Sequence, residues 1–264
     1  MEELHLLPGL HLLPGERLDS INENLRLIQK TDGLTFGTDA YLLAAFLRSG
    51  SKTMAAELGG GTGVLSLLAL TKQKASRTDV YEIQPEFAEL CRRNAALNGL
   101  MDRMHVLCSD VREITGSQSL DLVYTNPPYM KGDCGRENAV SAMNIARREV
   151  HGAIGDFCGA ADRLLKHGGT LAVVYRPDRF ADLICALREN HLEPKRVVFV
   201  YPSAGDRPCL VLTEAKKGAA SGMVIAPPLC IYDSADKKTY TPEMNRIYET
   251  CSMEFLFPGT GKSR

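Results

Sequence analysis

The stretch that decides the fold reads Thr53-Met54-Ala55-Ala56-Glu57-Leu58-Gly59-Gly60-Gly61-Thr62-Gly63. Residues 53–58 form a short run that is typical of a buried strand. The glycines at 59, 61 and 63 then let the backbone take positive φ and approach a ligand closely. The apolar run Gly63–Leu70 has the pattern of a helix. The stretch therefore predicts a strand, a glycine loop and a helix in direct succession.

The same alternation continues along the chain. Short apolar runs predict seven strands, at Thr53–Leu58, Asp79–Ile83, Arg103–Cys108, Leu120–Thr125, Thr170–Arg176, Arg196–Tyr201 and Pro208–Thr213. Helical patterns lie between most of them, at Gly63–Leu70, Pro85–Asn98, Ala153–His167 and Asp178–Asn190. This alternation predicts an α/β fold with a doubly wound, mostly parallel sheet. Only Pro202–Pro208 joins the last two strands, so we expect them to form a terminal antiparallel hairpin.

Both ends of the chain differ from this pattern. Residues 4–9 and 10–15 are an exact tandem repeat of Leu-His-Leu-Leu-Pro-Gly, too short for a solenoid, which we interpret as a duplicated or frayed leader. Asp39–Arg48 predicts a helix with an acidic residue in its first turn. The tail contains a helical pattern at Pro242–Cys251 and is expected to wrap over the surface. We predict an N-terminal extension, residues 1–35, and one domain, residues 36–264.

Composition excludes several classes of protein. The chain has 264 residues, 44% hydrophobic, with 31 basic and 32 acidic side chains. A chain of this length buries enough surface to fold without a disulfide or metal. The net charge of −1 excludes a polybasic binder, although basic residues can still gather on one face. Because no run of 18 apolar residues and no signal-peptide pattern occurs, we predict a cytoplasmic protein with no membrane segment.

The cysteines give no sign of a metal site. All eight stand singly, at least 17 residues apart, and no Cys-x-x-Cys pair occurs among them. Structural zinc sites and redox pairs normally need closely spaced cysteines. We therefore predict no metal and interpret the cysteines as buried, reduced thiols.

The glycine loop carries the first chemical signal, the pattern acidic-x-Gly-x-Gly-x-Gly that begins at Glu57. A dinucleotide fingerprint has Gly-x-Gly-x-x-Gly and places a pyrophosphate on the helix N-terminus. A carboxylate before the loop disfavours such an anion and favours a ligand that carries an ammonium or sulfonium group. A plain tight turn is the structural alternative. The spacing disfavours a nicotinamide-dependent reductase.

Acidic residues follow the next two strands as well. Glu82 ends one strand, where its carboxylate can accept both hydroxyls of a ribose. Asp110 follows the next strand and can accept the amino group of an adenine ring. A solvated strand end is the alternative for Glu82, and a helix N-cap is the alternative for Asp110. Because open α/β sheets bind ligands at the carboxyl edge, the three acidic residues predict a site there.

The sharpest signal is Asn126-Pro127-Pro128-Tyr129, directly after a predicted strand. The exocyclic amine of a base is a poor nucleophile because its lone pair is delocalised into the ring. The Asn126 side-chain oxygen and the Pro127 carbonyl can each accept one N–H of that amine and aim its lone pair at a methyl group. Tyr129 can stack on the base. A Pro-Pro turn that closes a strand is the structural alternative.

Together these residues resemble the class I S-adenosylmethionine-dependent methyltransferases, in the amino-methyltransferase branch with the Asn-Pro-Pro-Tyr signature, over about residues 53–176. A narrower resemblance to the bacterial tRNA1(Val) adenine-N6-methyltransferase family covers nearly the whole chain. Its motifs are Gly15–Asp19, Phe36–Ala40, Asn126–Lys131, Ala146–Glu149, His167–Gly169, Tyr175–Pro177 and Pro194–Val197.

This resemblance implies a Rossmann-like methyltransferase domain, S-adenosylmethionine as cofactor, and methylation of N6 of the adenosine 3′ of the anticodon in valine tRNA. The catalytic residues would be Asn126, Pro127, Pro128 and Tyr129. The cofactor-binding residues would be Thr38, Asp39, Glu57, Gly59, Gly61, Gly63, Glu82, Ile83, Asp110, Val111 and Asn126. A basic rim for tRNA would comprise Lys131, Arg147, Arg148 and Arg176, with Lys195 and Arg196 nearby. A generic solvated surface is the alternative for each basic residue.

Other functions fit parts of the same pattern. A protein-glutamine N5-methyltransferase would present a planar amide to the Asn-Pro-Pro-Tyr segment, although such enzymes usually carry a helical substrate-binding domain before the glycine loop. An adenine N6-methyltransferase acting on ribosomal RNA or DNA would need only a different rim. A nonenzymatic RNA-binding module is disfavoured because the glycine loop, Glu82 and the Asn-Pro-Pro-Tyr segment are all intact.

Overall fold

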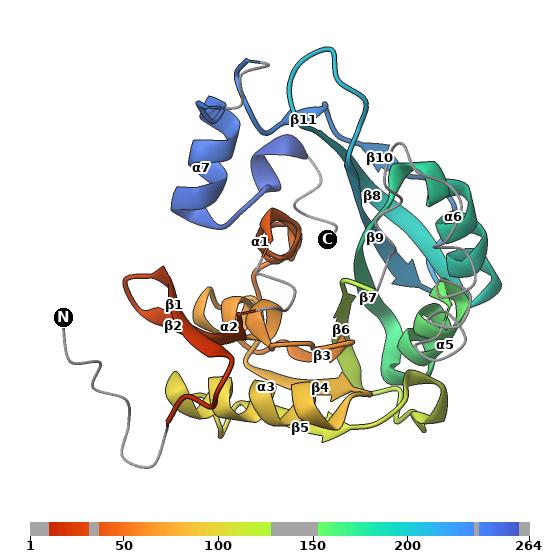
Figure 1. The fold of residues 1–264 in the computed structure, drawn as a ribbon. Helices are drawn as coiled ribbons and strands as arrows, with labels where there is room; N and C mark the ends of the chain where they lie inside the picture. Colours follow the sequence, from red (N-terminus) through yellow and green to blue (C-terminus); the bar gives the residue numbers. More distant parts are fainter. Residues whose placement is uncertain (1–10, 32–36, 128–152, 235–237, 259–264) are drawn as a thin grey trace, which may run out of the picture.

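One mixed β-sheet forms the centre of the computed structural model, which describes residues 11–31, 37–127, 153–234 and 238–258 (Figure 1). Its strand order is β10-β8-β9-β7-β6-β3-β4-β5, with β11 also paired to β8. The strands are β3 (Met54–Leu58), β4 (Arg77–Glu82), β5 (Met104–Cys108), β6 (Leu120–Thr125), β7 (Leu165–Tyr175), β8 (Leu192–Tyr201), β9 (Leu210–Lys217), β10 (Val224–Ile225) and β11 (Leu229–Cys230). The seven predicted strands are confirmed as β3 to β9.

Strand directions also follow the prediction. β3, β4, β5, β6 and β7 pair in parallel, so their carboxyl ends share one edge of the sheet. β9 lies between β7 and β8 and is antiparallel to both, which confirms the expected hairpin. The short strands β10 and β11, which extend the sheet beyond β8, were not predicted.

The helices cover both faces of the sheet. They are α1 (Thr38–Phe46), α2 (Val64–Thr71), α3 (Pro85–Leu97), α5 (Ile154–Leu164), α6 (Phe180–Glu189) and α7 (Pro242–Thr250), with short 3-10 turns η1 (Val111–Glu113), η2 (Pro177–Arg179) and η3 (Glu254–Leu256). The helix predicted to reach His167 ends earlier, because Leu165 is fully buried and pairs with Leu120 at the start of β7.

One hydrophobic cluster lies on each face of the sheet. α1, α2, α3 and α7 pack on one side, and α5 and α6 pack on the other, as Figure 1 shows. Alternation along β7 makes this division: Ala172 and Val174 join the first cluster, whereas Leu171 and Val173 join the second. The sheet is therefore covered on both faces, as expected for a doubly wound fold.

The N-terminal segment is more ordered than a frayed leader. Residues 1–10 lie outside the described residues, but β1 (Glu16–Asn22) and β2 (Leu25–Lys30) form a separate antiparallel hairpin. Leu25 and Leu27 are buried in the first hydrophobic cluster. Arg93 of α3 pairs with Glu16 and donates a hydrogen bond to the His11 carbonyl. Within the repeat, residues 11–15 are held by contacts with Arg93 and Glu16, so the interpretation as a frayed leader is wrong for these residues.

The C-terminal tail packs into the same core. Met244 and Ile247 of α7 are fully buried in the first cluster. Arg196 of β8 is 1% exposed, packs against the rings of Phe46 and Phe257, and pairs with Glu254 of η3 at 2.6 Å. The expectation that Arg196 lies on a basic rim is therefore wrong, because its guanidinium instead clamps the tail to the core.

Two expectations from composition are also tested by the structure. Within the described residues, no helix is long and apolar enough to cross a membrane. None of the seven described cysteines forms a disulfide, and Cys91, Cys158 and Cys251 are buried as expected. Cys108, Cys185 and Cys209 are exposed, so the interpretation as buried thiols is wrong for these three.

Candidate active site

The glycine loop joins β3 to α2 at the carboxyl edge of the sheet. The Gly59 and Gly60 amides both donate to the Tyr81 carbonyl of β4, at 2.8 and 3.1 Å. Gly59, Gly61 and Gly63 have φ of 77°, 52° and 80°, in the left-handed region that favours glycine. An added Cβ at Gly63 would lie 2.6 Å from Cys91 Sγ, whereas one at Gly61 meets no atom within 4 Å. The loop is thus tightly packed at its helix end and open at Gly61.

Glu82 holds this loop from the neighbouring strand. Its two carboxylate oxygens accept hydrogen bonds from the Gly61 and Gln84 amides, each at 2.8 Å. The residue is only 5% exposed. Since each carboxylate oxygen can accept more than one hydrogen bond, both retain capacity for a further donor. The sequence-predicted residues Glu82 and Gly61 are therefore in direct contact.

Glu57 lies beneath the loop instead of on its open side. The residue is 2% exposed, and its Oε2 accepts hydrogen bonds from the Ser66 amide and hydroxyl of α2. Burial raises the pKa of Glu57 to about 8, an effect that the Ser66 hydrogen bonds oppose and the nearby Glu82 carboxylate reinforces. In this geometry the carboxyl ties β3 to α2, and its direct contact with a ligand stays a prediction.

Asp110 is a helix N-cap, which was the structural alternative to a contact with a ligand. It is the N-cap of η1, where its side chain accepts a hydrogen bond from the Arg112 amide at 2.8 Å. The Arg112 guanidinium also pairs with the Asp110 carboxylate. The next residue, Val111, is 6% exposed and packs in the second hydrophobic cluster, whereas Ile83 is partly exposed. A role of Asp110 toward an adenine ring stays a prediction.

Asn126 and Asp39 come together at the end of β6. The Asn126 amide nitrogen donates a hydrogen bond to Asp39 Oδ2 at 3.0 Å. The Thr125 hydroxyl donates to the Leu58 carbonyl at 2.7 Å, which fixes the end of β6 against β3. With its nitrogen directed toward Asp39, the Asn126 side chain presents its carbonyl oxygen as an acceptor for another group.

The remaining predicted residues fall into two groups. Pro127 is described and buried, whereas Pro128, Tyr129, Lys131, Arg147 and Arg148 lie outside the described residues. Thr38 begins α1, and its hydroxyl hydrogen-bonds to Tyr248 of α7. Arg176 follows β7 at the same edge and pairs with Asp178 at 2.6 Å. The structure thus brings the glycine loop, Glu82, Asp39 and Asn126 to one edge of the sheet.

Two polar side chains that support this edge were not predicted. Asn94 of α3 is fully buried, and its amide nitrogen donates to the Thr62 carbonyl of the glycine loop at 2.9 Å. The Tyr124 hydroxyl of β6 contacts the hydroxyls of Ser66 and Thr78 within 3.0 Å. Burial raises the Tyr124 pKa well above its ordinary value. A polar residue inside an apolar strand was the only sequence signal for Tyr124.

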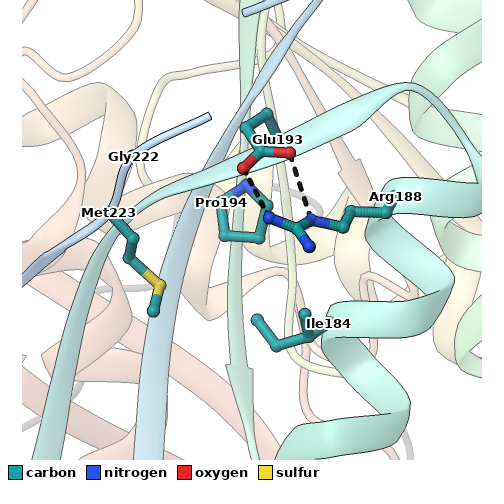
Figure 2. Close-up of a pocket in the computed structure, with 6 residues that line it drawn as sticks. All are labelled: Ile184, Arg188, Glu193, Pro194, Gly222 and Met223. Atoms are coloured by element: carbon teal, nitrogen blue, oxygen red, sulfur yellow. Dashed lines mark hydrogen bonds and ion pairs between the residues drawn. The ribbon is translucent and has the colours of Figure 1, made fainter. Parts of the chain in front are cut away.

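A separate cleft lies at the opposite edge of the sheet. β8 runs parallel to β7, because both are antiparallel to β9, so Glu193 and Pro194 stand at the amino edge. Figure 2 shows Arg188 of α6 paired with Glu193 across this cleft, at 2.9 Å, with Ile184 and Met223 lining the space. The described residues that line the cleft include none of the predicted site residues.

Solved structures establish the class of fold. A predicted O-methyltransferase from Agrobacterium tumefaciens superposes with a TM-score of 0.67 and 22% identity, over 81% of this chain and 97% of the other. The TYW2 protein of M. jannaschii, solved in complex with AdoMet, superposes with a TM-score of 0.54 and 12% identity, over 78% and 88% of the two chains. The fold is therefore that of a Rossmann-like methyltransferase.

Sequence comparison defines the family. The methyltransferase small domain model matches residues 31–189, more than half of the chain, so the chain belongs to this family. A tRNA1(Val) (adenine(37)-N6)-methyltransferase from Porphyromonas gingivalis is 29% identical over 237 residues, which cover 84% of this chain and 91% of the relative. A relative of the same name from Dyadobacter fermentans is 24% identical, over 83% and 90% of the two chains.

Proposed function

We propose that this chain transfers a methyl group from S-adenosylmethionine to N6 of an adenine in tRNA, namely the adenosine 3′ of the anticodon of valine tRNA. The observation that carries the proposal is the hydrogen bond from the Asn126 amide nitrogen to Asp39 at 3.0 Å. It leaves the Asn126 carbonyl oxygen as the group available to an amine. The names of the relatives from P. gingivalis and D. fermentans support tRNA as the substrate.

The residues at the carboxyl edge fit the proposed cofactor. The backbone at Gly61 is open, since an added Cβ there meets no atom within 4 Å. Glu82 lies beside it with hydrogen-bond capacity for ribose hydroxyls, and Asp110 stands at the end of the next strand. Thr38 and Asp39 would lie toward the amino-acid end of the cofactor. When bound, S-adenosylmethionine supplies an electrophilic methyl group on a sulfonium.

The side chains and carbonyls of the chain orient the amine. The Asn126 oxygen and the Pro127 carbonyl each accept one N–H of N6, which draws the nitrogen toward tetrahedral geometry and frees its lone pair. S-adenosylmethionine held there would supply the methyl group and leave as the thioether, and the methylated amine would lose its proton to water. Fixing two reactants in this geometry can supply about 7–11 kcal/mol of the barrier.

Other parts of the proposal concern the substrate. Tyr129 would stack on the target adenine, and Lys131, Arg147, Arg148 and Arg176 would contact tRNA phosphates. Arg176 is 30% exposed at the side chain and is already paired with Asp178, so its contribution to RNA binding should be smaller than that of an unpaired cation. We place the reaction in the cytoplasm, where tRNA is modified.

The direct test is transfer of labelled methyl from S-adenosylmethionine to unmodified valine tRNA, followed by digestion to nucleosides. We expect N6-methyladenosine with the native chain, and about a hundredfold to a thousandfold lower turnover with Asn126→Ala, because the acceptor is lost. Cofactor binding, measured by calorimetry, should survive in this variant. Asn190→Ala is the matched control, since Asn190 caps α6 through the Ala186 carbonyl, away from the carboxyl edge.

Other outcomes would assign other functions. Label in a release-factor glutamine, ribosomal RNA or DNA, but not in tRNA, would move the activity to one of these substrates. RNA binding that needs no cofactor, with no label in any substrate, would indicate a nonenzymatic module. Full activity of Asn126→Ala would contradict the role assigned to Asn126.

Asp39 is proposed as the residue that positions Asn126. In Asp39→Asn, the amide partner of Asn126 loses its charge and can itself donate, so the Asn126 side chain can rotate. We expect kcat to fall by about tenfold or more, while KM for tRNA changes less. An unchanged kcat, with cofactor affinity also unchanged, would refute this positioning role.

A further inference from the structure

Four tyrosine rings form a continuous ladder beside the candidate active site. Tyr232 and Tyr240 stack with ring centroids 5.3 Å apart and planes only 13° from parallel. Tyr240 contacts Tyr248 of α7 at 5.1 Å, and Tyr248 contacts Tyr41 of α1 at 5.0 Å. Tyr240 is 38% exposed, whereas Tyr41 is 8% exposed. The ladder thus runs from Tyr41 in the core at α1, through Tyr248 and the exposed Tyr240, to the partly exposed Tyr232.

The inner two rings of the ladder, Tyr248 and Tyr41, are linked by hydrogen bonds to the predicted site residue Thr38. The Tyr248 hydroxyl hydrogen-bonds to Thr38, and the Tyr41 hydroxyl donates to the Tyr248 carbonyl at 3.0 Å. Thr38 immediately precedes Asp39, which holds Asn126. Helices α1 and α7 are in contact, and Figure 1 shows α7 beside α1. Tyr240 is therefore connected to the Asp39–Asn126 pair through Tyr248 and Thr38.

The backbone around the outer rings is held in place. Tyr232 and Tyr240 form an antiparallel bridge, and the Asp233 amide donates to the Thr239 carbonyl at 2.9 Å. The Thr241 amide donates to the Ile231 carbonyl, and the Thr241 hydroxyl donates to the Cys230 carbonyl at 2.7 Å. Because the rings are already ordered, stacking of a partner on them costs little side-chain conformational entropy.

We propose that Tyr240, supported by Tyr232 and Tyr248, is a stacking site for an unpaired base of the RNA substrate next to the methylated adenosine. This inference rests on the proposed function, since it takes the substrate to be RNA. Any nucleobase can stack on a flat aromatic ring, whatever the RNA sequence. Single-stranded loops such as an anticodon loop expose bases for such stacking. The parallel Tyr232–Tyr240 pair offers the flat geometry to which a base can add.

Charge around the ladder favours stacking over phosphate binding. Lys238 and Arg246 are exposed nearby, but so are Asp233, Glu243 and Glu249. Arg246 already lies over the Phe255 ring at 4.2 Å. With cations and carboxylates balanced in this way, the surface is not a strong phosphate site. We therefore expect binding energy here to come from the rings and to vary little with salt.

The first test compares binding of an unmodified valine tRNA transcript by Tyr240→Leu and Tyr240→Phe. Loss of the ring should weaken tRNA binding about tenfold, whereas Tyr240→Phe should bind like the native chain. S-adenosylmethionine binding and kcat at saturating tRNA should stay within about twofold in both. Phe199→Leu is the matched control: Phe199 belongs to a part-exposed ring pair with Phe180 on the α6 side of the sheet.

The second test uses the absence of tryptophan from the chain. Tyr240→Trp keeps a stacking ring and adds the single tryptophan of the chain, whose emission should be quenched by tRNA and by an isolated anticodon stem-loop. Phe199→Trp should not be quenched. These readouts need no turnover, so they decide the stacking site even if the methyl acceptor proves not to be tRNA.

Several results would overturn the inference. Native tRNA affinity in Tyr240→Leu, or no quenching of Tyr240→Trp by tRNA, would refute the stacking site while leaving the proposed methyl transfer intact. Quenching by a glutamine-containing release-factor peptide, and not by RNA, would show that the ladder binds protein. If Tyr240→Leu has a lowered melting temperature, its weaker tRNA binding could come from unfolding. The quenching of Tyr240→Trp then decides whether the stacking site exists.

Discussion

The glycine loop and the C-terminal tail lie near the same helix, α1, but they are held in place in different ways. The loop is fixed by backbone amides that donate to Tyr81 and to Glu82, partners about 20 residues away in the chain. The tail is fixed by Arg196, whose hydrogen bonds to Phe46 and Glu254 span 150 and 58 residues. The backbone geometry of a glycine loop is therefore visible in a short stretch of sequence, whereas a side-chain clamp is visible only in the folded chain.

The largest loss in the free energy of unfolding is expected from a methyl group added inside the glycine loop. Gly63→Ala forces a positive φ of 80° on alanine and drives its Cβ to 2.6 Å from Cys91 Sγ and 2.7 Å from Met104 Cε. The left-handed conformation costs about 1–2 kcal/mol, and overpacking adds about 1–3 kcal/mol. We expect the free energy of unfolding, from urea titration, to fall by about 4 kcal/mol.

Gly61→Ala is the matched comparison. It has a similar backbone conformation, with φ of 52°, but open space around the added Cβ. Only the conformational cost of about 1–2 kcal/mol should remain. Equal destabilisation by the two alanines would show that the contacts of Gly63 do not matter, and the loop would then be set by backbone conformation alone.

The second effect concerns the buried carboxyl under the loop. Folding raises the pKa of Glu57 from 4.5 to about 8, so between these pH values the folded chain binds a proton that the unfolded chain releases. The contribution of protonated Glu57 to the free energy of unfolding is fully present below pH 4.5 and is lost as the pH rises through 8. From pH 5 to pH 8 the free energy of unfolding should therefore decrease by about 3 kcal/mol because of this group.

Glu57→Gln should remove that part of the pH dependence, because an amide of the same shape does not titrate in this range. Urea titrations of both chains at pH 5, 6, 7 and 8 provide the measurement. Parallel stability curves for the native and variant chains would mean that Glu57 is ionised in the folded state at neutral pH.

The third effect tests the tail clamp. Arg196→Met keeps an apolar stem against the Phe46 and Phe257 rings but loses the ion pairs with Glu254 and Glu214 and the hydrogen bond to the Phe46 carbonyl. We expect a loss of about 2–3 kcal/mol in thermal or urea unfolding, below the usual cost of breaking a buried pair because Glu254 can turn to water and Glu214 retains Arg48.

A readout specific to the tail accompanies that measurement. Limited proteolysis should cleave Arg196→Met near α7 faster than the native chain, since the clamp that holds η3 is gone. Glu254→Gln keeps the guanidinium and its stacking, so it should lose less than about 1 kcal/mol. Unchanged proteolysis of Arg196→Met would mean that the apolar contacts of Met244 and Ile247 hold the tail without the clamp.

The smallest effect comes from a helix cap in the tail. Thr241 is the N-cap of α7 and accepts a hydrogen bond from the Met244 amide at 3.2 Å. Thr241→Ala should lower the free energy of unfolding by about 1 kcal/mol. Thr241→Ser keeps the hydroxyl and should restore most of the loss, and a Ser variant as unstable as the Ala variant would point to the methyl group instead.

This difference between loop and tail also explains what the sequence could predict. Seven strands, six helices and the sites of Glu82 and Asn126 follow from local periodicity and from strand ends. The β1–β2 hairpin was not predicted, because its alternation is weak and it is held by Asn94 and Asn98 of α3, some 70 residues away. The burial of Glu57 and Arg196 depends on packing from distant elements, which no local pattern records.

Asn94 has a consequence for how the molecule would respond to a ligand. One buried side chain accepts from the Ile28 amide at 2.7 Å and donates both to the Ile28 carbonyl and to the Thr62 carbonyl of the glycine loop. Ordering of the loop and docking of the hairpin are thereby thermodynamically linked. The Ile28 amide proton should exchange with deuterium more slowly when the loop is occupied, so the N-terminal hairpin reports binding at a site that it does not itself form.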